Sequence, residues 1–128
     1  YLVGPSWLVA ELDKVVLPYQ LDVAKQIAGR LALQFVGQME ERVNTIVAER
    51  ERLAAAMSTM PLHVFPSGAN FILFRAGDRA IEIRDALRDR GVLIRDRSYE
   101  IPGCVRVTIG TREQVERFLT ELENLWIR

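Results

Sequence analysis

The stretch GVLIRDRSYEIPGCVRVTIGT, residues 91–111, places two arginines inside segments that otherwise have the composition of core strands. Three apolar residues lead into Arg95, and two valines bracket Arg106. Burying an unpaired guanidinium costs several kcal/mol or more, so a strand built only for a core would not carry one. The two arginines therefore raise the question of which anion they bind.

Strand alternation assigns the Arg106 side chain to one face of a sheet. Val105, Val107 and Ile109 share the opposite face. Because that apolar set must pack against covering helices, Arg106 projects from the other face, held by a rigid element as an anion clamp would be.

Arg95 lies near the end of the neighbouring strand, with Leu93 and Arg97 on its face. Spacing alone leaves a second interpretation open for Arg95 and Arg106. Both could be ordinary surface arginines that form salt bridges, for instance with Asp96 or Glu100.

The residues around this stretch predict an α+β fold, a small, mostly antiparallel sheet covered on one face by helices and preceded by long helices. Helical periodicity indicates a helix capped by Ser6 and ended by Pro18, a second capped by Asp22, and a third after a break at Gly37. Strand, helix, strand, strand, helix follow, with short connections and a Pro102-Gly103 turn between the two arginine strands.

Three more local signals fix the second half. Asp78 is the expected cap of the helix between the strands, and Gly91 its left-handed stop. Thr111 and Gln114 form a capping box for the last helix. One core is expected, made of Phe71, Leu73, Val105, Val107, Phe118 and Leu122.

Composition narrows the function classes. The 128 residues carry 17 basic and 17 acidic side chains, and this zero net charge argues against a nucleic-acid binder. There is no apolar run near the roughly 20 residues that span a bilayer, and no signal peptide, so we expect no membrane partner and a cytoplasmic location. The lone Cys104 fits a reducing compartment.

Other chemistries have little support. His63 is the only histidine, so no metal site is expected, and it has no nucleophile motif near it. Cys104 has no activating base beside it. Of the 17 basic residues, only Lys14 and Lys25 are lysines.

The segments SGANFILFR, GVLIRDRS and PGCVRVTIGT, followed by REQVERFLTEL, resemble in order and spacing the C-terminal small domain of histidinol-phosphate aminotransferase and its close relatives. These are fold-type I enzymes that use pyridoxal 5′-phosphate. The opening YLVGPSWLVAELDKVVLPYQ is similar to the family's passage from the large domain into the hinge. The resemblance implies residues 1–20 as the tail of a large domain and hinge, and residues 21–128 as the small domain.

The resemblance also implies roles for the two arginines. Arg106 would bind the substrate's carboxylate or phosphate, and Arg95 would face its phosphate end. Asn70 is a candidate for a supporting residue behind these contacts. The implied reaction is transamination of histidinol phosphate with 2-oxoglutarate and glutamate, in histidine biosynthesis.

Two departures leave the substrate open. Pro18-Tyr19-Gln20 replaces the usual Pro-Tyr-Asn, and residues 98–104 form a loop that varies in the family. Relatives that transaminate aromatic amino acids or decarboxylate threonine phosphate share the same pattern of segments.

The reaction needs a lysine that forms a Schiff base with the cofactor. Neither Lys14 nor Lys25 has a suitable context, so we expect no catalytic residue in this chain and no cofactor bound covalently to it. The family's lysine lies in a large domain, which we expect to be missing here, and the complete enzyme is expected to be a homodimer. A stand-alone binding module that kept the fold without the chemistry is the other class left open.

Overall fold

The computed structural model describes residues 3–17 and 21–126. The chain divides into two compact units, Tyr1–Met39 and Glu40–Arg128, which are described separately below. The helix expected to end at Pro18 ends earlier, at Asp13. The Pro18-Tyr19-Gln20 segment lies outside the described residues. The boundary expected between residues 20 and 21 stays a prediction for the same reason.

The first unit is helical. It contains α1 (Ser6–Asp13), α2 (Val23–Ala32) and the short 3₁₀ helix η1 (Leu33–Phe35). Asp22 caps α2 as expected, since its Oδ1 accepts a hydrogen bond of 2.9 Å from the N–H of Lys25. Ser6 is not the cap of α1, because that helix begins at Ser6 itself with Pro5 in the cap position.

Helix α3 (Val36–Met57) begins one residue before Gly37. The expected break is therefore at η1, where the backbone tightens into a 3₁₀ turn, and Gly37 lies in the first turn of the following helix. The part of α3 that belongs to the second unit buries Glu49, Leu53 and Met57.

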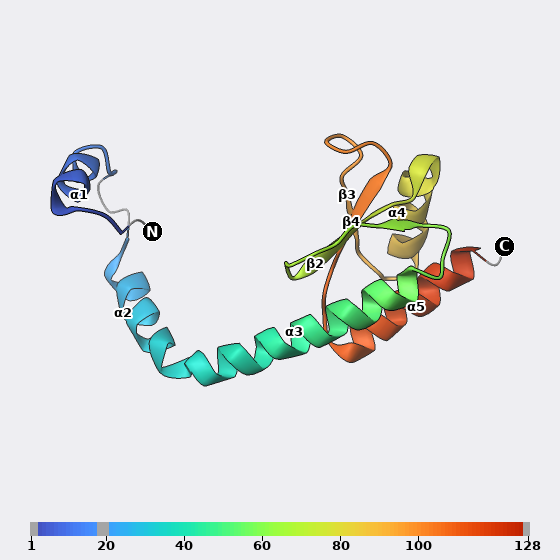
Figure 1. The fold of residues 1–128 in the computed structure, drawn as a ribbon, viewed down its shortest axis with the longest axis horizontal. Helices are drawn as coiled ribbons and strands as arrows, with labels where there is room; N and C mark the ends of the chain where they lie inside the picture. The colour runs from blue at the N-terminus through green and yellow to red at the C-terminus, as the bar shows by residue number, and fades with distance from the viewer. Residues whose placement is uncertain (1–2, 18–20, 127–128) are drawn as a thin grey trace. The chain divides into compact units, whose positions relative to one another are not determined.

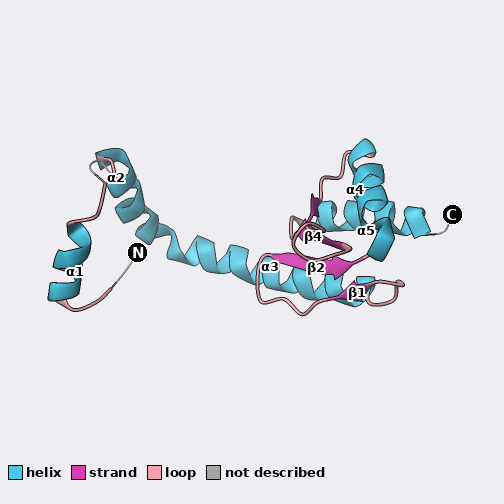
Figure 2. Cartoon of the chain, turned by 90° about the horizontal axis from the view of Figure 1, so that it is seen from above, coloured by secondary structure: helices cyan, strands magenta, loops and turns pink. Residues whose placement is uncertain are grey.

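The second unit is built on four described strands, which pair antiparallel throughout in the order β1-β2-β4-β3. Figure 1 labels β2, β3 and β4 of this sheet. The strands are β1 (His63–Val64), β2 (Phe71–Arg75), β3 (Arg95–Asp96) and β4 (Cys104–Thr108). Helix α4 (Ala80–Asp89) connects β2 to β3, and α5 (Arg112–Trp126) follows β4. Figure 2 shows the strands β2 and β4 beside these helices. The expected α+β fold, an antiparallel sheet packed against helices, is confirmed.

One hydrophobic core lies between the sheet and the helices. Ile72 and Phe74 of β2 and Val105 and Val107 of β4 face it, and Phe74 lies 6.4 Å, ring to ring, from Phe118. Ile109, which follows β4, also lies in the core. Helices α3, α4 and α5 supply the rest of the buried set, Leu53, Met57, Ala80, Ile83, Leu87, Val115, Phe118, Leu119 and Leu122.

The expected core included two wrong residues from β2. Phe71 is paired with Thr108 and Leu73 with Arg106, so both lie on the face away from the core and are only half-buried. Every residue of β2 from 71 to 74 is apolar, so its pattern has no period of two from which the inward face can be read. A shift of one position exchanges the two faces of a strand.

The ends of the helices follow the sequence signals in part. Gly91 adopts the left-handed conformation, with φ of 77°, just after α4. Asp78 does not cap α4, because a 3₁₀ turn (η2, Gly77–Arg79) precedes the helix and Arg79 occupies the cap position. The capping box is present: the N–H of Thr111 donates to Oε1 of Gln114 at 2.9 Å, and the N–H of Gln114 donates to Oγ1 of Thr111 at 3.4 Å.

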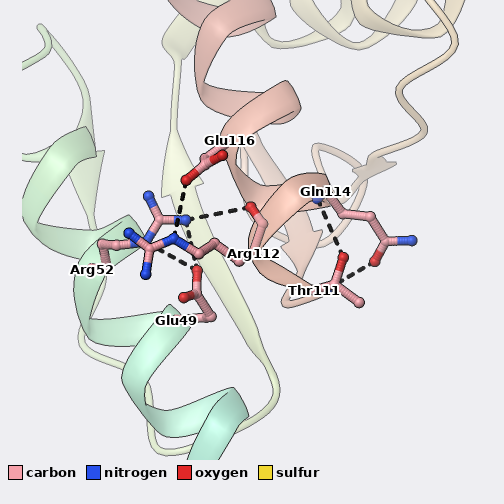
Figure 3. A network of polar contacts seen from close by, with 6 residues as sticks. All are labelled: Glu49, Arg52, Thr111, Arg112, Gln114 and Glu116. Atoms are coloured by element: carbon pink, nitrogen blue, oxygen red, sulfur yellow. Dashed lines mark hydrogen bonds and ion pairs between the residues drawn. The ribbon is translucent and has the colours of Figure 1, made fainter.

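A polar network fixes the start of α5 against α3 (Figure 3). The buried carboxylate of Glu49 accepts two hydrogen bonds from Arg52, which also donates to the carbonyl of Arg112 at 3.5 Å. Arg112 pairs with Glu116 one turn further along. Because β4 leads directly into this turn, the network holds the end of the strand that carries Arg106.

Two glycine turns close the other end of the sheet. The N–H of Ala76, after β2, donates to the carbonyl of Gly103, before β4, at 2.9 Å. Gly103 has φ of 70°, and a Cβ added to it would lie 2.8 Å from the Cα of Gly77. The turn into β4 therefore packs backbone against backbone on the turn out of β2.

Candidate functional site

The sheet has a second face, away from the helices, which we call the open face. From β2 it carries Phe71, Leu73 and Arg75, and from β4 Cys104, Arg106 and Thr108, by the register of the two strands. Arg95 of β3 joins them, because it is the register partner of Arg106. Arg95 and Thr108 are exposed, Arg106 is half-buried, and Cys104 is fully buried.

The structure brings the two predicted arginines together as direct cross-strand neighbours. Like charges at this position destabilise an antiparallel pair, because directly opposite Cβ atoms lie only about 4.5–5.5 Å apart. Among the described residues, neither guanidinium has a hydrogen-bonding or ion-pairing partner, and Nε of Arg106 is buried without one. An anion placed between them would satisfy both charges.

The nearby carboxylates are engaged elsewhere. Asp96 accepts a 2.8 Å hydrogen bond from the N–H of Ser98 and lies 3.9 Å from a terminal nitrogen of Arg84. Glu100 pairs with Arg97, whose guanidinium also donates to the hydroxyl of Tyr99 at 2.9 Å. The interpretation of the strand arginines as salt-bridged to Asp96 or Glu100 therefore does not describe this structure.

Ser98 lowers the pKa of Asp96. The side chain of Ser98 lowers this pKa most, and the N–H of Ser98, which donates to the carboxylate, lowers it next. The charge of Arg84 lowers the pKa further. Burial acts in the opposite direction and is weaker. Asp96 is thus held as an anion on the helix side of β3, directed away from the arginine pair.

Asn70 is not part of the arginine pair. It is exposed and precedes β2, and its carbonyl accepts a 2.9 Å hydrogen bond from the N–H of Ile109. Alternation assigns its side chain to the face opposite Phe71. Asn70 supports the pairing of β2 with β4 through its backbone.

Phe71 is the site residue that sequence reasoning missed. Cζ of Arg106 lies 4.9 Å from the centroid of the Phe71 ring, within the range of a cation–π contact. The signal that could have found it is the arginine itself, because a guanidinium packs favourably over the face of an aromatic ring.

A cavity of about 440 Å³ lies beside the end of β4 and does not include the arginine pair. Its walls are largely apolar, and they include Leu53, Leu93, Thr108 and Phe118. We place the candidate site on the open face because its donors are there. No group of three or more metal-ligating side chains occurs in the described part of the chain. Within residues 3–17 and 21–126, no helix has the length and apolar character of a membrane span.

The fold and the comparisons define the class of protein. A family model described as "Aminotransferase class I and II" matches residues 1–122, and the chain belongs to this family. The structure also matches the histidinol-phosphate aminotransferase of Clostridium acetobutylicum with a TM-score of 0.82 over 93% of this chain and 37% of that one. At 22% identity, this likeness concerns the fold alone.

The chain is also similar in sequence to two aminotransferases of different named activity. The chain is 40% identical over 126 residues to the histidinol-phosphate aminotransferase of Thermosynechococcus vestitus, covering 96% of this chain and 33% of that protein. It is 38% identical over 130 residues to the aromatic amino acid aminotransferase of Corynebacterium jeikeium, covering 96% of this chain and 34% of that protein. The chain thus spans about a third of the length of these relatives.

The residues of this chain do not fit covalent attachment of the family's cofactor, pyridoxal phosphate. Lys14 and Lys25 are both exposed and belong to the helical first unit. Each is paired with an acid of its own helix or cap, Lys14 with Glu11 and Lys25 with Asp22, which is 2.7 Å away. Neither lines a described cavity, so no reaction step is assigned to either lysine.

Proposed function

We propose that this chain is the substrate-binding small domain of a pyridoxal phosphate-dependent aminotransferase. The observation that carries the proposal is the direct opposition of Arg95 and Arg106 on the open face, without an acidic partner in the described residues. Such a pair is costly without a ligand and favourable with a bound oxyanion. The share of the relatives' length that is covered supports a large domain elsewhere in the same polypeptide.

Histidinol phosphate is the proposed substrate, with 2-oxoglutarate and glutamate as the exchanging pair. Two guanidinium groups suit a phosphate monoester, because three oxygens and up to two negative charges can engage both. Relatives of 36–41% identity that carry the histidinol-phosphate aminotransferase name support this choice. The large domain would supply the Schiff-base lysine, and the enzyme would work as a cytoplasmic homodimer.

An aromatic amino acid aminotransferase is the second candidate, favoured by the 38% identical Corynebacterium relative. In that case Arg106 would bind the substrate carboxylate, and Arg95 would have no phosphate to bind. The two candidates therefore differ in the role of one arginine.

The test uses the full-length enzyme with histidinol phosphate and its phosphate-free analogue, histidinol. Arg106→Ala should lower kcat/KM by about 100-fold or more, since two or more charge-assisted hydrogen bonds and the substrate's orientation are lost. Arg106→Lys should be nearly as damaging, because an ammonium cannot reproduce the planar fork. Arg95→Ala should be severe with histidinol phosphate and mild with histidinol.

Each outcome distinguishes the candidates. An equal effect of Arg95→Ala on both substrates would exclude phosphate recognition by Arg95 and favour the carboxylate-binding alternative. If both arginine variants kept kcat/KM within about threefold of wild type, the substrate-binding role would be wrong, and a non-catalytic binding module would be the better description.

A further inference from the structure

We propose that Phe71 is a positioning residue for the anion site, and that its ring holds the Arg106 guanidinium in the orientation that binds. The inference rests on the proposed function, because it concerns how the same arginine pair is prepared for its ligand. It goes further by assigning a role to a residue that touches no reacting atom.

The contact follows from the register of two strands. Arg106 is directly opposite Leu73, and Phe71 is two residues earlier on β2, so Phe71 is a diagonal neighbour of Arg106 on the open face. Diagonal neighbours lie within reach of each other when one side chain is aromatic and the other long. The distance of 4.9 Å from Cζ of Arg106 to the ring centroid of Phe71 shows that the two side chains are in contact.

The stacking restricts which nitrogens of Arg106 can bind. Nε is buried without a hydrogen-bonding partner, so an incoming oxyanion does not reach it without displacing its cover. The two terminal nitrogens are then the available donors. A guanidinium fixed in this way offers one defined pair of donors, and less side-chain entropy is lost when the anion binds.

The ring also offsets the repulsion from Arg95. The face of an aromatic ring carries negative electrostatic potential, which attracts a cation placed over it. Without the ring, repulsion between the two opposed guanidinium groups would favour rotamers of Arg106 that turn away from Arg95. Phe71 therefore keeps the charge of Arg106 beside that of Arg95.

The same face contains a matched control. Cζ of Arg75 lies 5.6 Å from the ring centroid of Phe65, and Arg75 is paired with Cys104 rather than with an arginine. Phe65→Leu removes a comparable cation–π contact without touching the Arg95–Arg106 pair. It separates a specific effect on the anion site from a general loss of aromatic packing.

The experiment measures inorganic phosphate as a competitive inhibitor of the full-length enzyme, with kcat and KM for histidinol phosphate and thermal stability. Phe71→Leu should weaken phosphate binding about fivefold to tenfold, as loss of a partly desolvated cation–π contact implies, and raise KM similarly. The value of kcat should change by less than about twofold, because substrate that has bound still occupies the same site. Phe71→Tyr, which keeps the ring face, and Phe65→Leu should both stay within about twofold of wild type.

Three results would overturn the inference: unchanged phosphate binding in Phe71→Leu, equal losses in Phe71→Tyr and Phe71→Leu, or an equal loss in Phe65→Leu. If Phe71→Leu does not fold, Phe71→Met takes its place in the same comparison. Arg106→Ala separates the two proposals. Unchanged phosphate binding in that variant refutes the anion site itself, whereas a loss there without one in Phe71→Leu refutes only the role of the ring.

Discussion

The two faces of β4 share one backbone and have opposite chemistry. On the helix side, Val105 and Val107 are buried in the core. On the open side, Arg106 is half-buried and lies opposite another arginine. The difference teaches that one five-residue strand can stabilise the fold with alternate residues and carry the arginine of the proposed anion site between them. Changes on one face should therefore affect stability, and changes on the other should affect binding.

The largest expected effect comes from breaking the core face. Phe74→Ala should cost about 3–5 kcal/mol of unfolding free energy, because the ring is fully buried against Phe118. Leu73→Ala, on the neighbouring position but the open face, should cost less than about 2 kcal/mol. Urea denaturation of both variants measures the contrast, and equal losses would contradict the assignment of the two faces.

A backbone change should affect both faces together. Gly103→Ala combines a positive φ with a Cβ position 2.8 Å from Cα of Gly77, so we expect a loss of about 1–3 kcal/mol and weaker phosphate binding. Gly68→Ala is the control, since nothing lies within 4 Å of its added Cβ, and it should change stability by less than about 0.5 kcal/mol. Full phosphate affinity in a destabilised Gly103→Ala would show that this turn does not position the arginines.

Removing one of the opposed charges should stabilise the protein slightly. In phosphate-free buffer, Arg95→Gln should raise the unfolding free energy by about 0.2–1 kcal/mol, because the like-charge pair is gone. The same substitution should reduce the stabilisation that added phosphate gives to wild type. Arg97→Gln is the control, because Arg97 is paired with Glu100, and it should give no increase. Thermal unfolding with and without phosphate tests both expectations.

The smallest effect is a dependence on pH that arises on the helix side of β3. The folded-state pKa of Asp96 is below its ordinary value of 3.8, so its ionised form stabilises the fold above that pH. This contribution is lost as the pH falls through the folded-state pKa. Asp96→Asn should therefore be less stable than wild type at pH 7, and the gap should close below about pH 4. A gap that is constant between pH 7 and pH 3 would contradict it.

The sequence predicted the orientation of β4 because polar and apolar residues alternate there. Arg106 was assigned to the correct face for that reason, and the capping box at Thr111 was recognisable because it depends on residues only three apart. The prediction for β2 failed at Phe71 and Leu73, because its apolar run has no alternation to read.

The rest of the site depends on pairing between distant segments. The register of three strands must be known before Arg95 can be placed directly opposite Arg106 and Phe71 diagonally across from Arg106. The contact of Gly103 with Gly77 likewise joins turns 26 residues apart. Local patterns contain no information on such distances, which is why the arginines were found from the sequence but their surroundings were not.

The connection between β3 and β4 is anchored at both ends, and this bears on how substrate specificity could change among related enzymes. Its two ends are fixed by backbone hydrogen bonds, from the N–H of Arg97 to the carbonyl of Cys104 at 2.9 Å and from the N–H of Ala76 to the carbonyl of Gly103 at 2.9 Å. We therefore expect residues 98–102 to tolerate exchange while both arginine strands keep their register. Grafting this segment from a relative of different specificity should alter the surroundings of an anion at the proposed site and leave Arg95 and Arg106 in place.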